Sequence, residues 1–173
     1  DYVVASSSWS VGSLDNAGAV TLGSAAMGIS GAVDGSNSLI GNAAESRVGS
    51  GGVVALDNGN YVVSSPLWDN GALLDVGAAT FGSGVGGAIG LLAPGNSLVG
   101  SSANDRVGLA ITALDNGNYV VISERWSNGP ATSAGAVTFG SGVAGVSGAV
   151  GAGNSLVGST LNDRVGSAGV AAL

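Results

Sequence analysis

The stretch ALDNGNYVV occupies residues 55–63, and the same nine letters return at residues 113–121, 58 positions later. Asn-Gly between two apolar runs is the strongest short signal for a β-hairpin, because a type I′ turn needs positive φ at both central residues. The sequence therefore predicts tight turns at Asn58-Gly59 and Asn116-Gly117, with positive φ at both glycines. These four residues are assigned a structural role.

A two-residue turn also determines how the flanking segments pair. GVVAL before the turn and NYVVSS after it become antiparallel partners, and Leu56 faces Tyr61. The two halves of this hairpin also stand apart in the sequence, as DYVV at its beginning and GVAAL at its end. We therefore expect Gly169–Leu173 to pair antiparallel with Asp1–Val4 of another chain.

The repeated stretch belongs to a unit that occurs three times. We interpret residues 1–173 as one repeat domain, with repeats at 1–56, 57–114 and 115–173. The following landmarks recur in phase: Trp9, Trp68 and Trp126; Asn37, Asn96 and Asn154; Arg47, Arg106 and Arg164. Each unit contains four short segments rich in β-formers and separated by glycine-rich turns, and none shows the 3.6-residue period of a helix. The sequence predicts an all-β fold with four strands per repeat of about 58 residues.

The composition disfavours several classes of function. Eleven acidic residues against four arginines give a net charge of −7, whereas nucleic acids and anionic membranes attract clustered cations. No apolar run reaches about 18 residues, so we expect no membrane insertion. Histidine, cysteine and lysine are absent, which removes the commonest general bases and nucleophiles. We expect no catalytic residue, no cofactor, no metal and no enzyme activity.

The order of the motifs in each unit resembles a known family. RVG at residues 106–108, YVVSSP at 61–66 and GAVTFGSG at 135–142 stand where the FG-GAP blade of integrin-type β-propellers has its Phe-Gly pair, its Gly-Ala-Pro strand and its third strand. The resemblance implies that the repeats are propeller-type blades. In that family the hairpin carries a calcium loop, but here it has shrunk to LDNGNY, which is too short to supply six to eight oxygen ligands.

The repeats are also similar to those of very large bacterial surface proteins of the filamentous-haemagglutinin kind. NSLVGSTLNDRVG at residues 154–166 is part of this likeness. It implies an extracellular or cell-surface location and a structural or adhesive scaffold without catalysis.

Two arrangements of the three units are open at this point. Three blades make half a propeller, so two chains joined head to tail through their terminal strands give a six-bladed ring with twofold symmetry, or a filament if the rotation does not close. The alternative is a self-closed threefold β-fold, a β-trefoil or a β-prism, in which each unit is one lobe.

Two sets of landmark residues are candidates for ligand contact or for structural roles. The tryptophans either pack between repeats or, as an alternative function, form a lectin-like platform on which a glycan stacks beside a neighbouring asparagine. The candidate glycan-binding residues are Trp9, Trp68, Asn70, Trp126 and Asn128. Arg47, Arg106 and Arg164 are interpreted as structural, each tying a carboxylate or loop carbonyls together.

Overall fold

A computed structural model describes residues 1–173, which form β-strands, turns and loops without any helix. The first repeat contains β1 (Tyr2–Ser6), β2 (Ala19–Gly23) and β3 (Ser38–Ile40). The second sheet is built from β4 (Gly52–Ala55), β5 (Tyr61–Ser65), β6 (Ala78–Gly82) and β8 (Ser97–Val99). The third sheet is built from β9 (Ala110–Ala113), β10 (Tyr119–Ser123), β11 (Ala136–Gly140) and β13 (Ser155–Val157).

The second and third sheets are antiparallel meanders of four consecutive segments, in the orders β4-β5-β6-β8 and β9-β10-β11-β13. These are the four segments per repeat that the sequence predicts. The first sheet has only the last three of them, so β1 is an edge strand. The second and third sheets therefore each begin with a strand that precedes the repeat boundary in the sequence.

The hairpin between β4 and β5 differs from its prediction in register. Ala55, rather than Leu56, pairs with Tyr61, and the main-chain N–H of Leu56 donates to the carbonyl of Asn60 at 2.8 Å. The loop therefore has three residues, and Gly59 alone adopts positive φ, at 85°. A three-residue loop that ends in a left-handed glycine, as in a G1 bulge, matches the right-handed twist of the two strands. Asn58 therefore does not need a left-handed conformation.

The third sheet repeats this geometry at its own hairpin. Gly117 has φ of 79°, so the predicted positive φ at both glycines is confirmed. The prediction of type I′ turns is wrong for both hairpins, because neither Asn58 nor Asn116 has positive φ.

Two further strands, β7 (Gly90–Leu91) and β12 (Gly148–Ala149), are absent from the sequence-based prediction. Each leaves its own repeat and joins the preceding sheet in parallel: β7 pairs with β3, and β12 pairs with β8. The N–H of Leu92 extends the first contact by donating to the carbonyl of Ile40 at 3.0 Å. Neighbouring repeats are thus joined by main-chain hydrogen bonds as well as by side chains.

The hydrophobic core lies between the sheets. Strand β5 of the middle sheet turns Tyr61 and Val63 toward the first repeat and Val62 toward the third. This alternation, which follows from the pleat of a β-strand, divides the core into two clusters. The cluster at the first junction, between the first and second repeats, comprises Val20, Leu39, Val48, Tyr61, Val63, Trp68, Val76, Ala78, Leu92 and Val99. The cluster at the second junction, between the second and third repeats, comprises Leu56, Val62, Ala79, Leu98, Val107, Tyr119, Val121, Trp126, Ala136 and Val150.

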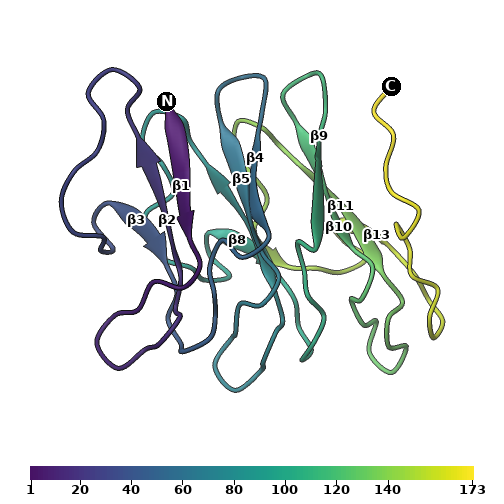
Figure 1. Ribbon diagram of the computed structural model, residues 1–173. Helices are drawn as coiled ribbons and strands as arrows, with labels where there is room; N and C mark the ends of the chain where they lie inside the picture. Colours follow the sequence, from purple (N-terminus) through teal and green to yellow (C-terminus); the bar gives the residue numbers. More distant parts are fainter.

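Figure 1 shows the three sheets standing in a row, with the N-terminus on the first sheet and the C-terminus beyond the third. The sheets form no closed barrel, and the last strand in the chain is β13. The chain therefore does not close on itself as the threefold alternative requires. Residues Gly169–Leu173 form no strand within this chain, and their pairing with Asp1–Val4 of another chain stays a prediction.

Candidate functional site

The tryptophans of the second and third repeats lie inside the junctions. The side chains of Trp68 and Trp126 are buried, Trp68 completely, and each packs in the cluster shared with the preceding repeat. The indole N–H of Trp68 donates to Oδ1 of Asn42 in the first repeat at 3.2 Å. Neither ring offers a face to a sugar, so the glycan-stacking alternative is wrong for these two residues.

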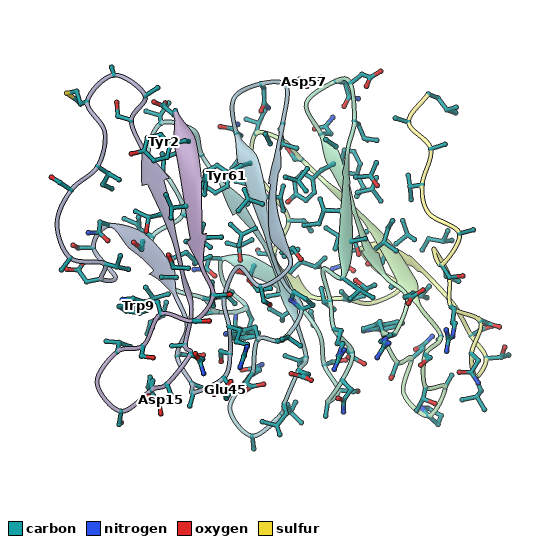
Figure 2. The ribbon with its side chains drawn as sticks, viewed as in Figure 1. Tyr2, Trp9, Asp15, Glu45, Asp57 and Tyr61 are labelled. Carbon is teal, nitrogen blue, oxygen red and sulfur yellow. The ribbon has the colours of Figure 1, made fainter.

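Trp9 is half-buried, because none of the three sheets covers the face of the first repeat on which it lies. Figure 2 places it with Asp15 and Glu45 toward one end of the first sheet, whereas Asp57 lies at the opposite end of the molecule. The two candidate asparagines are half-buried as well. Asn128 donates its side-chain amide to the carbonyl of Gly158 at 2.9 Å, and the main chain of Asn70 bridges to Leu73.

The Asn-Asp-Arg loop of the second repeat forms one of the polar contacts of the second junction. One oxygen of the Asp105 carboxylate accepts hydrogen bonds from the N–H groups of Ser101 and Ser102, at 2.9 and 2.8 Å. The other oxygen accepts from the N–H of Ser127 in the third repeat at 2.9 Å. Burial raises the pKa of this carboxyl group, and the three N–H donors oppose that change. Asp105 therefore ties the loop after β8 to the loop that carries Trp126.

The same position differs in the other two repeats. Asp163 accepts from the N–H groups of Ser159 and Thr160, but it lies exposed, and hydrogen bonding, first from the Thr160 side chain, lowers its pKa. The first repeat has Ser46, whose hydroxyl is buried without a hydrogen-bond partner. The sequence places an acid before two of the arginines, but nothing in it shows that the next repeat supplies a third donor.

The three arginines repeat one backbone conformation. Arg47, Arg106 and Arg164 have φ of 46°, 49° and 47°, which is left-handed and uncommon for a residue with a Cβ. Arg47 contacts Glu45 at 2.7 Å and Arg106 contacts Asp75 at 3.1 Å. No ion pair joins Arg164 to a carboxylate, so the shape of the loop does not depend on that contact.

Asparagines at the hairpin turns connect the second and third repeats. Asn58 and Asn60 both donate their side-chain amides to the carbonyl of Gly142, each at 2.7 Å. The Oδ1 of Asn60 accepts from the N–H of Gly84 in its own repeat at 2.9 Å. The turn is therefore a second polar contact across the junction, at the end of the sheet opposite the Trp loops. The repetition of Asn-Gly-Asn in the sequence indicated a turn, but not this contact.

The third set of asparagines caps a turn before a strand. Asn96 accepts from the N–H of Ala93 at 2.9 Å and donates to the carbonyl of Leu91 at 2.9 Å. Asn37 and Asn154 make the corresponding contacts in their own repeats.

The largest hollow on the molecule, about 550 Å³, is an open groove between the hairpin loops of the first and second repeats. Leu22, Met27, Val85 and Ile89 line it, and Asp1 is its charged residue. The structure contains no cluster of acidic, histidine or cysteine residues that could hold a metal ion. It contains no long apolar helix that could cross a bilayer.

Comparison with protein families matches residues 1–50, 55–109 and 113–167 to a family described as a repeat of unknown function (DUF5650). No curated protein and no solved structure matches the chain. Each of the three matched segments carries one Trp loop and one arginine loop. Since the three matches cover most of the sequence, the chain belongs to the DUF5650 repeat family.

Proposed function

We propose that the chain is a non-catalytic repeat scaffold from a secreted or cell-surface protein. One observation carries the proposal: the polar residues that recur from repeat to repeat are used to build turns and junctions. Asp105 and Asn58 bond across the second junction, Asn96 caps a turn, and Arg106 pairs with Asp75. A repeat unit whose recurring groups are used in this way supports stacking more than chemistry.

The proposal includes propeller-type blades. A blade is a four-stranded antiparallel meander that packs its faces against its neighbours. The second and third sheets have this strand order, and the middle sheet is packed on both faces. The parallel strands β7 and β12 are an addition to a plain four-stranded blade, and they strengthen the link between neighbouring sheets.

The proposed function can be tested by measuring whether the distance between two repeats is fixed. A scaffold holds points on different repeats at one fixed distance, and the chain has no cysteine, so dyes can be attached at introduced ones. Met27 and Val143 are 89% and 81% exposed in the loops of the first and third repeats, so cysteine there leaves the junctions intact. Single-molecule energy transfer between dyes at these sites should give one narrow peak.

A matched control weakens one junction. Trp126→Ala removes a buried side chain between the labelled positions and should broaden or shift the peak. Adding a broad panel of glycans should leave the wild-type peak unchanged. A broad distribution for the wild type would contradict a scaffold, and a saturable glycan signal that is lost in Trp9→Ala would favour the lectin alternative.

A further inference from the structure

The third sheet has an apolar face on which no further sheet of this chain packs, and only the C-terminal segment Val170–Leu173 lies beside it. Leu98, on the face that the second sheet turns toward the third, is fully buried, whereas its counterpart Leu156 is 69% exposed. Phe139, the counterpart of Phe81, is 56% exposed. We call this surface the outer C face; it is formed by Leu114, Val120, Phe139, Leu156 and Val165, which follow the matching residues of the second repeat by 58 positions. An exposed apolar surface of this kind marks an interaction site.

The first sheet has the complementary surface. Val63 of the second repeat is fully buried in the first junction, whereas its counterpart Val4 is 43% exposed. Tyr2, the counterpart of Tyr61, is exposed to the same extent. We call this surface the outer N face; it is formed by Tyr2, Val4, Trp9, Val33 and Ile40, which precede the matching residues by 59 positions. In both internal junctions a C face packs on an N face.

Main-chain groups at the two outer faces also correspond. At the junctions β7 and β12 add in parallel to β3 and β8, but no strand adds to β13. The counterpart of β7 in the first repeat is Gly31-Ala32, which is not a strand in this chain although Gly31 has positive φ like Gly90. This segment is therefore shaped to pair with a preceding repeat.

The outer edge of strand β1 is also unpaired. β4 pairs with β5, whereas the corresponding edge of β1 has no partner. The counterpart of β4 in the third repeat is the segment Gly169–Ala172, which has no partner either. Gly169 has φ of 91°, close to the 88° of Gly52 at the start of β4. Unpaired strand edges recruit other chains, and here the two free edges are the two halves of one hairpin.

Polar groups at the outer faces match as well. Asn58 bonds to the carbonyl of Gly142 across the second junction, and the counterpart pair across the outer faces is Asn116 with Ala25. Asp105 accepts from the N–H of Ser127, and the counterpart pair there is Asp163 with Ser10. Every class of contact in the second junction thus has both of its halves on the outer faces.

We propose that the outer N face of a second copy of this chain docks on the outer C face, head to tail, and reproduces the contacts of the internal junctions. The occupant is another copy because the internal junctions are continuous with both faces and use the same residues at the same positions. The inference rests on the proposed scaffold function, which makes stacking the role of the repeat. Since the two faces differ, the contact is heterologous and gives either a closed ring or a filament.

Two single substitutions separate this arrangement from any other self-association. Val4→Glu places a charge on the outer N face, and Leu156→Glu places one on the outer C face. Both side chains are exposed in the single chain, so each variant should keep the far-UV circular dichroism of the wild type. An unpaired buried charge costs several kcal/mol, so each variant alone should associate at least about 100-fold more weakly than the wild type.

Mixing the two variants is the decisive measurement. Each retains the face that the other has lost, so sedimentation velocity should show a 1:1 complex in the mixture and monomers in each variant alone. Val143→Glu is the control: Val143 is 81% exposed, and its counterpart Val85 is 97% exposed although it has neighbours on both sides, so this variant should associate like the wild type.

Three results would overturn the proposal. They are a wild-type chain that stays monomeric at millimolar concentration, a Val4→Glu variant that still dimerises, or a mixture that forms no complex. If the chain stays monomeric but keeps a narrow energy-transfer peak, the docking proposal is wrong and the proposed scaffold function still holds. A broad peak would instead contradict the scaffold itself.

Discussion

Replacing Trp68 with alanine removes the largest fully buried side chain of the first junction. Substitutions of this kind in a packed core cost about 3–5 kcal/mol in free energy of unfolding. Trp9 occupies the same position in the first repeat but is less completely buried, so Trp9→Ala should cost about 1 kcal/mol less than Trp68→Ala. Urea denaturation followed by far-UV circular dichroism measures both values without relying on tryptophan fluorescence.

The indole N–H groups allow a finer comparison. Trp68 donates to Asn42, whereas the N–H of Trp126 is buried with no partner. Trp68→Phe loses a hydrogen bond of about 0.5–1.5 kcal/mol, and Trp126→Phe removes an unpaired buried donor, so Trp68→Phe should be the more costly of the two. Equal costs for Trp9→Ala and Trp68→Ala would refute the reasoning, because they would show that packing of Trp68 in the junction adds nothing to the free energy of unfolding.

Three further predictions concern the hairpins and the buried tyrosine. Gly59→Ala should cost about 1–2 kcal/mol in thermal or urea unfolding, because its φ of 85° is left-handed although the space around a Cβ is open; a neutral result would contradict this. Asn58→Ala should cost about 1 kcal/mol more than Asn116→Ala, because only Asn58 bonds across a junction; equal losses of melting temperature would count against that contact. Burial raises the pKa of Tyr119 to about 12, so the unfolded chain, with an ordinary tyrosine pKa, loses its proton first as pH rises from about 10. The free energy of unfolding should then fall between about pH 10 and pH 12, and less steeply in Tyr119→Phe; a flat profile for the wild type would contradict the shift.

The sequence contained most of the information about local structure. The in-phase landmarks and the β-rich segments were sufficient to predict an all-β fold of three repeats, although the predicted last segment of the third repeat, Gly169–Leu173, forms no strand. The hairpin at Asn58-Gly59 was identified correctly, but its register was one residue off, because a two-residue turn and a three-residue loop that ends in glycine share the same letters. Leu56 then pairs with Asn60 instead of Tyr61.

Contacts between repeats were harder to predict. The strands β7 and β12 have only two residues each, and they exist because the preceding sheet offers an edge. No local propensity encodes them. The roles of Asp105 and Asn58 likewise depend on donors and acceptors in the next repeat. The Trp set was recognised as an inter-repeat candidate, but its burial could be established only from the stacked sheets.

Successive residues along β5 point to opposite faces of the sheet, so residues that are adjacent in the sequence belong to different hydrophobic clusters. Val62 and Val63 are adjacent in the sequence, yet one belongs to the second junction and the other to the first. Val63 shares its cluster with Val20, which lies in another repeat. Effects of substituting the two neighbours should therefore add independently, whereas Val63 and Val20 should be coupled. A lineage of such repeats can thus alter one junction by changing every second residue of a strand and leave the other junction as it was.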